Sequence, residues 1–133
     1  MAASFQLEIV TPIEVIDCGQ VDYLRASGAD GLFGVEGRHT RMMTALKVGE
    51  VKVVSGGKNR YYAIGPGYAD IQGQSVQLLV ESAEEARSID AARAQAAAER
   101  ARTRLKQKAD IDAARAETAL ARAINRLSVA GRK

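Results

Sequence analysis

The stretch IDAARAQAAAERARTRL at residues 89–105 returns 22 positions later as IDAARAETALARAINRL at residues 111–127, with 11 identities in 17 positions. Neither copy contains glycine or proline, and both are rich in alanine, the residue with the highest helix propensity. Asp110 stands directly before the second copy, where its carboxylate would cap a helix N-terminus. We therefore predict two helices that fold back on each other as a hairpin, with one continuous helix as the alternative.

Each predicted helix has an alanine-rich face and an opposite face that carries arginines. At about 100° per residue, the second helix places Ala116, Leu120, Ala123, Ile124 and Leu127 opposite Arg115, Arg122 and Arg126. The first helix likewise places Ala94, Ala98 and Leu105 opposite Arg93, Arg100 and Arg104. Burying an alanine methyl group releases far less free energy than the roughly 1.5–3 kcal/mol of a buried leucine. We therefore expect a hairpin that is helical by propensity but weakly held, and able to move.

The sequence before the repeat has the composition of a β domain. Residues 1–82 hold all six aromatic residues, both prolines and eleven of the twelve glycines. Phe5, Leu7 and Ile9 alternate with polar residues, which is the period of a half-buried strand. Further strands are predicted at residues 21–26, 49–54, 60–64, 68–71 and 75–80, with turns at residues 18–19, 55–57, 65–67 and 72–73.

Short strands at this spacing are typical of a sandwich or barrel. The predicted fold class is therefore α+β by segments, with an N-terminal antiparallel β-sandwich followed by a C-terminal α-helical hairpin. The predicted domains are residues 1–84 and 85–133. Between the first strands, Gly28, Gly31, Gly34 and Gly37 recur at every third residue without proline, which excludes a collagen helix. We predict a long surface loop there, as a candidate contact for a partner.

Composition and charge exclude several kinds of site. A single cysteine, Cys18, cannot form an internal disulfide, and a single histidine, His39, leaves no zinc-ligand set. Neither side chain has a partner for nucleophilic catalysis, so no enzymatic activity is expected. No apolar run approaches the roughly 18 residues of a membrane span, and residues 1–10 lack the pattern of a secretory signal. We therefore expect a cytoplasmic chain without metal.

The basic character of the chain lies in its helical part. Residues 83–133 hold 12 lysines and arginines against 7 acidic residues, whereas residues 1–82 hold 7 against 9. A solvated helix face is the plainest explanation of the arginines. Two arginine faces brought together would repel each other unless an anion lay between them, and guanidinium groups bind phosphate oxygens in bidentate fashion. A nucleoside triphosphate or an acidic protein surface is favoured over nucleic acid, because no aromatic residues interleave with the arginines.

Four segments resemble the epsilon subunit of bacterial F-type ATP synthase: LEIVTP at residues 7–12, GADGLFGVEGRHTRMMTALKVG at 28–49, IDAARA at 89–94 and ALARAINRLSVA at 119–130. They cover nearly the whole chain in the family's order. The resemblance implies a non-catalytic subunit of the central stalk, bound to the gamma subunit and resting on the c-ring. Such a subunit couples c-ring rotation to ATP synthesis in the alpha/beta head, at the cytoplasmic face of the membrane.

The resemblance also implies a regulatory hairpin. In many members the hairpin extends along gamma, and basic residues of its last helix meet the beta subunit and block ATP hydrolysis. Candidate partner contacts are His39, Arg115, Arg122 and Arg126. No cofactor is required, but ATP would be a regulatory ligand, and the residues that match the family's ATP-sensing motif are Glu84, Ile89, Asp90, Arg93, Ala94, Arg100, Arg122 and Arg126. A stand-alone nucleotide-sensing module and a nucleic-acid adaptor are the alternatives.

Overall fold

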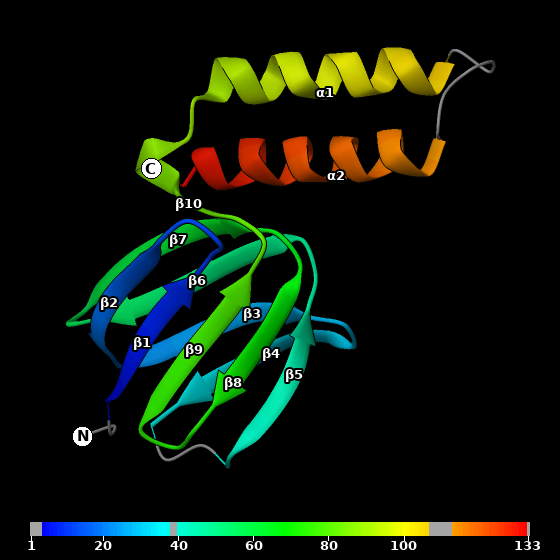
Figure 1. Ribbon diagram of the computed structural model, residues 1–133. Helices are drawn as coiled ribbons and strands as arrows, with labels where there is room; N and C mark the ends of the chain where they lie inside the picture. The colour runs from blue at the N-terminus through cyan, green and yellow to red at the C-terminus, as the bar shows by residue number, and fades with distance from the viewer. Residues whose placement is uncertain (1–3, 38–39, 107–112, 133) are drawn as a thin grey trace.

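The computed structural model describes residues 4–37, 40–106 and 113–132, in which a β-sandwich is followed by two helices (Figure 1). The strands are β1 (Phe5–Val10), β2 (Val15–Val21), β3 (Tyr23–Gly28), β4 (Gly31–Glu36), β5 (Met42–Leu46), β6 (Gly49–Ser55), β7 (Lys58–Ile64), β8 (Gly67–Ile71), β9 (Ser75–Val80) and β10 (Ala83–Glu85). A short 3-10 turn, η1 (Ala86–Ser88), leads to α1 (Ala91–Lys106) and α2 (Ala113–Ala130). The predicted fold class is confirmed.

All described strands belong to one hydrogen-bonded sheet that folds over on itself (Figure 1). Its order is β10-β7-β6-β3-β5-β8-β9-β1-β2, with β4 paired to β3 outside this path. Strand β3 carries the fold from one layer to the other, because it pairs with β6 at Tyr23–Arg25 and with β5 only at Gly28. Strands β1 and β9 run parallel, whereas the other neighbours are antiparallel. This closure buries the apolar faces of both layers.

The core follows from the alternation of side chains along the strands. In β1 every second residue is buried, and Phe5, Leu7 and Ile9 are fully so. Strand β9 alternates in the same way, with Val76 and Leu78 inside. The apolar faces of these strands thus pack into one shared core, and the polar residues between them face outward.

Strand β2 was not predicted, and the turn expected at residues 18–19 is wrong. Both residues lie inside β2, where the pairing with β1 steps from Leu7 opposite Gly19 to Glu8 opposite Asp17. Cys18 is therefore the extra residue of a β-bulge, and Gly19 adopts a positive φ of 71°. Gly19 permits a bulge within a strand. From sequence alone, a glycine at a bulge looks the same as a glycine in a turn.

The long surface loop predicted for the segment from Gly28 to Gly37 is also wrong, because β4 lies within it. Strand β4 pairs along the full length of β3. A Cβ at Gly34 would come 2.6 Å from the Tyr23 hydroxyl oxygen. Gly34 is therefore a position of close side-chain approach within a strand.

The two helices lie side by side and antiparallel at one end of the sandwich (Figure 1), so the predicted hairpin is confirmed and the continuous helix is wrong. Asp90 caps α1, since its Oδ1 accepts a hydrogen bond from the backbone N–H of Arg93 at 3.1 Å. The capping role predicted for Asp110 falls outside the described residues. Within the part of the chain that is described, no helix is both long and apolar enough to cross a membrane.

A substitution at Gly67 tests the packing of β8 on β9. A Cβ there would collide with the Leu79 carbonyl oxygen and would lie 2.7 Å from Val80 Cα. We expect Gly67→Ala to lower the free energy of unfolding by about 1–3 kcal/mol, because backbone atoms of β9 must move. Gly131→Ala is the matched control, since its nearest contact would be 3.4 Å. Urea denaturation of both variants measures the difference, and equal stabilities would contradict the described packing.

Candidate functional site

The candidate site is the seam between the hairpin and the sandwich, where α2 lies against β6, β7 and η1. An apolar cluster forms its base, and its buried members are Ala63, Ala86, Ile89, Val129 and Ala130, with Tyr61 packed against them. We call this set of residues the seam cluster. Ile89 and Val129 are its largest buried side chains, and Tyr61 at the edge is only partly buried. The apolar contact that holds the hairpin is therefore small.

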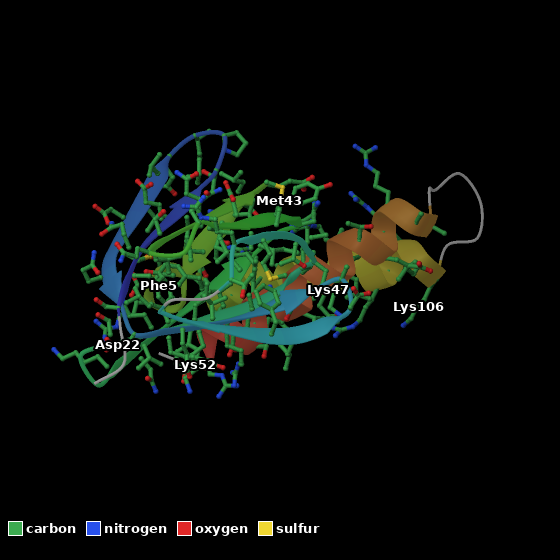
Figure 2. All side chains as sticks on the ribbon, turned by 90° about the horizontal axis from the view of Figure 1, so that it is seen from below. Phe5, Asp22, Met43, Lys47, Lys52 and Lys106 are labelled. Atoms are coloured by element: carbon green, nitrogen blue, oxygen red, sulfur yellow. The ribbon has the colours of Figure 1, made fainter. Side chains whose placement is uncertain are left out.

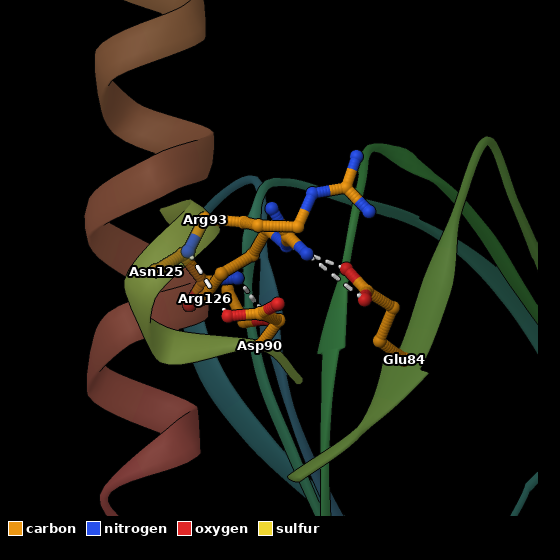
Figure 3. A network of polar contacts seen from close by, with 6 residues as sticks. Glu84, Asp90, Arg93, Asn125 and Arg126 are labelled. Atoms are coloured by element: carbon orange, nitrogen blue, oxygen red, sulfur yellow. Dashed lines mark hydrogen bonds and ion pairs between the residues drawn. The ribbon is translucent and has the colours of Figure 1, made fainter. Parts of the chain in front are cut away.

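Polar contacts join α2 to the segment that leaves the sandwich (Figure 3). Arg126 binds Glu84 in bidentate fashion, with Nε 2.6 Å from Oε1 and Nη2 3.1 Å from Oε2. One turn earlier, Arg122 Nη2 lies 2.8 Å from Glu81 Oε2. Between them, the Asn125 side-chain amide donates to the Gly49 carbonyl oxygen at 2.9 Å. The side chains of the Arg126–Glu84 pair are 30% and 37% exposed, so this pair is partly shielded from solvent.

Small residues determine how closely α1 approaches α2. Ala94, Ala98 and Ala101 are buried on α1, and Ala116 and Ala123 are buried on α2. Ile124, which the helical period placed on the apolar face, is instead 46% exposed. Arg126, expected on the opposite face, is half-buried against Glu84. The reason is that α2 has two contact faces, one toward α1 and one toward the sandwich.

The structure brings only some of the predicted ATP-sensing residues together. Glu84 and Arg126 are in contact, and in Figure 3 the Arg93 side chain extends from α1 toward the side on which this pair lies. Asp90 caps α1, while Ile89 and Ala94 are buried by packing.

The remaining predicted arginines occupy other positions on the two helices, and Arg122 lines a cavity together with Glu84 and Arg126. Arg100 is exposed on α1, and Arg115 is exposed on α2. Arg122 contacts Glu81, which the sequence analysis did not single out. His39 falls outside the described residues.

Sequence reasoning missed Glu81, Asn125, Val129 and Ala130. The repeat ends at residue 127, but α2 continues to Ala130 and buries its last two residues in the seam cluster. The sequence did contain a signal for Asn125, Val129 and Ala130, because Asn125 and the Ser-Val-Ala ending at residues 128–130 depart from the arginine–alanine pattern of the helices. Glu81 gave no signal, since its partner is set by the docking of α2 and not by local sequence.

A cavity of about 80 Å³ lies under α2, beside Glu84, Arg122 and Arg126. Ligand pockets usually measure roughly 300–1,000 Å³. With the hairpin docked in this way, the cavity is too small to enclose a nucleotide. A nucleotide would have to bind to the outer arginines or to a rearranged hairpin.

A larger apolar groove of about 490 Å³ lies on β5, β8 and β9. It is lined by Pro12, Leu46, Pro66, Tyr68 and Leu79, among others. Tyr68 is 55% exposed and Leu79 is 38% exposed. Apolar side chains gathered on a surface in this way mark a site for a protein partner.

The buried cysteine is unsuited to chemistry. Cys18 Sγ lies 3.7 Å from the Tyr62 hydroxyl oxygen, and burial raises the pKa of both groups. Both side chains are therefore neutral at pH 7, and the thiol is not a nucleophile. Among residues 4–37, 40–106 and 113–132, no three His, Cys, Asp or Glu side chains gather as metal ligands.

Comparisons with known proteins match both parts of the chain. Residues 4–86 match the model of the ATP synthase delta/epsilon chain β-sandwich domain, and residues 87–131 match that of the long α-helix domain. An ATP synthase epsilon chain of Anaeromyxobacter sp. (strain K) is 43% identical over 128 residues, covering 95% of this chain and 97% of the relative. The epsilon chain of Desulforamulus reducens is 42% identical over 108 residues, covering 81% and 82%.

The fold also matches solved structures. A chain from the OSCP/F1/c-ring structure of the Euglena gracilis mitochondrial ATP synthase superposes with a TM-score of 0.77 and 25% identity, covering 98% of this chain and 82% of that one. A chain from the central stalk/c-ring structure of the Tetrahymena thermophila mitochondrial enzyme gives a TM-score of 0.55 at 9% identity, covering 64% and 69%. The second likeness concerns the fold alone.

Two isoleucine substitutions test the contribution of the seam cluster. Ile89 is 2% exposed, whereas Ile124 is 46% exposed. We expect Ile89→Ala to weaken hairpin docking by about 2–4 kcal/mol, because a cavity opens in the cluster. Ile124→Ala, the matched control, should change docking by less than about 1 kcal/mol. Amide hydrogen exchange in α2 measures docking, and equal exchange rates in the two variants would contradict the assignment.

Proposed function

The chain belongs to the delta/epsilon family of ATP synthase subunits, as an epsilon chain of the bacterial type, which is a stalk subunit and not an enzyme; from this premise we propose how its two parts act. The β-sandwich attaches the subunit to the central stalk, between the gamma subunit and the c-ring, so that c-ring rotation is coupled to gamma. The alpha and beta subunits are the further partners, and the subunit lies peripherally at the cytoplasmic face of the membrane. The apolar groove of β5, β8 and β9 supports a protein contact of this kind.

The second part of the proposal is that the hairpin is a detachable regulator of ATP hydrolysis. The observation that carries it is the composition of the seam, which consists of one small apolar cluster and partly exposed ion pairs. Exposed ion pairs contribute only about 0.2–1 kcal/mol each, so such a seam opens at low cost. When undocked, α2 frees Arg122 and Arg126 from Glu81 and Glu84, and these cations then face the beta subunit.

The third part is that ATP favours the folded hairpin. In Figure 3 the side chains of Arg93, from α1, and Arg126, from α2, both extend toward the side of Glu84, and Arg100 and Arg122 lie at other positions of the two helices. The phosphate groups of ATP would bridge cations of both helices through bidentate hydrogen bonds. A ligand that binds only the folded hairpin stabilises it by RT ln(1 + [ATP]/Kd). Falling ATP would then release the inhibitory form.

Titration of the isolated chain with Mg-ATP, ADP and GTP, followed by amide NMR, tests this nucleotide site. We expect saturable ATP binding that weakens about tenfold or more in the Arg93→Ala/Arg126→Ala variant, because charge-assisted hydrogen bonds worth about 1.5–3 kcal/mol are lost. Lys58→Ala is the control, as it removes a positive charge at the start of β7. Equal binding in both variants, or none at millimolar ATP, would contradict the ATP-sensing proposal.

Binding to the gamma subunit separates the proposed role from the two alternatives. A stand-alone nucleotide-sensing module would show no affinity for gamma. A nucleic-acid adaptor would bind DNA or RNA with a steep dependence on salt concentration. We expect the chain to bind gamma and to show no such salt-dependent binding to nucleic acid.

A further inference from the structure

A pocket of about 310 Å³ lies where β7, the segment from β10 to η1, and the end of the chain after α2 meet. We call it the β7–η1 pocket, and its polar and aromatic lining is Asn59, Arg60, Tyr61, Glu85, Arg87 and Arg132. None of these residues belongs to the set that matches the ATP-sensing motif. Three guanidinium groups thus line a pocket that contains one carboxylate.

Two of the three arginines are held in place by neighbouring groups. Arg60 Nη2 donates to the Cys18 carbonyl oxygen at 2.8 Å. The Arg132 guanidinium lies over the Tyr61 ring, 5.3 Å from its centroid, and its Nε donates to Glu50 Oε2 at 3.2 Å. Each guanidinium group still has N–H donors that these bonds do not use. Both cations are therefore oriented before any ligand arrives, which lowers the entropic cost of binding.

Arg87 completes the set from η1. It is exposed, and within the described residues it makes no hydrogen bond or ion pair. Glu85, two residues earlier, likewise forms no ion pair with a described residue. With Glu85 in the lining and Glu50 paired to Arg132, the three guanidinium groups still leave one positive charge in excess. Gathering like charges is unfavourable unless an anion offsets them.

The chemistry and the size of the pocket indicate the class of ligand. Guanidinium forks match the oxygen geometry of phosphate, and Asn59 offers a further neutral donor. The volume lies at the lower end of ligand pockets, which begin at about 300 Å³. We propose that the β7–η1 pocket binds a small phosphate-bearing anion, either inorganic phosphate or the phosphate group of a nucleotide. The ligand is held by Arg60, Arg87 and Arg132.

The position of Arg132 gives this binding a mechanical consequence. Arg132 stands two residues after Ala130, the last residue of α2, whereas Arg60 belongs to β7 and Arg87 to η1. An anion that contacts all three joins the end of the hairpin to the sandwich. It would therefore bind the docked arrangement in preference to an undocked one and shift the population toward it.

Amide NMR of the full chain, titrated with inorganic phosphate and separately with ATP at constant ionic strength set by chloride, tests the pocket. We expect saturable chemical-shift changes at the amides of Tyr61, Arg87 and Arg132. The amides of Arg93 and Arg126 report separately on binding at the hairpin arginines. Saturation with phosphate identifies the free anion as sufficient, whereas saturation with ATP alone assigns the site to a nucleotide. Both results support a phosphate-bearing ligand.

Arg87→Gln should weaken the binding by about fivefold or more, because it removes one charge-assisted hydrogen-bonding partner of the anion. Arg104→Gln removes the same charge from an exposed position on α1 and should leave the affinity within about twofold of the parent. Because Arg87 is exposed and unpartnered in the described chain, its loss should leave the rest of the amide spectrum unchanged. Shifts that follow ionic strength without saturating, or equal affinities in the two variants, would overturn the proposal. If ATP fails to bind the hairpin arginines but phosphate still saturates the β7–η1 pocket, the ATP-sensing proposal fails and this one is retained.

Discussion

The bidentate ion pair between Arg126 and Glu84 sets the orientation in which the hairpin meets the sandwich, while the seam cluster supplies most of the docking free energy. Glu84 belongs to β10, which pairs with β7 at the edge of the sheet, and Arg126 belongs to the last helix. The pair therefore joins the hairpin to the last strand of the sandwich, across 42 positions of the chain. Within the described residues, the Arg122–Glu81 and Arg132–Glu50 pairs, the Asn125–Gly49 hydrogen bond and the seam cluster add to it. A sandwich with an extensive core thus carries a hairpin held by a small number of reversible contacts.

This difference between core and seam explains how function can be divided between the two parts. The sandwich closes its sheet around side chains such as Phe5, Leu7 and Leu78, which are fully buried. Such a body transmits force without changing shape, as a rotating stalk requires. The hairpin packs through alanines and ends in a few anchoring residues, so its docked state is only marginally favoured. Under the proposed regulation, a change in ligand or partner concentration would then alter its position.

The sequence was most informative where one physical rule dominated. Strands with strict alternation and a repeated helix without glycine or proline were predicted correctly, as was the hairpin. The turn at residues 18–19 and the glycine-rich loop were both predicted wrongly. Gly19 permits a bulge and Gly34 permits the approach of Tyr23, and neither role is distinguishable from a turn by composition. Glu81 and the Arg132–Tyr61 contact depend on tertiary docking. Helical periodicity alone could not reveal that α2 has two buried faces.

A double-mutant cycle on Glu84→Gln and Arg126→Gln, with hydrogen exchange of the α2 amides as the readout, tests the central role of this ion pair most directly. The Arg102–Glu99 pair within α1 provides a control cycle, because it does not join the hairpin to the sandwich. We predict a coupling energy of about 0.5–1 kcal/mol in α2 docking for Glu84 and Arg126, and none for the control pair. Additive effects of the two substitutions, with unchanged exchange in α2, would contradict this account.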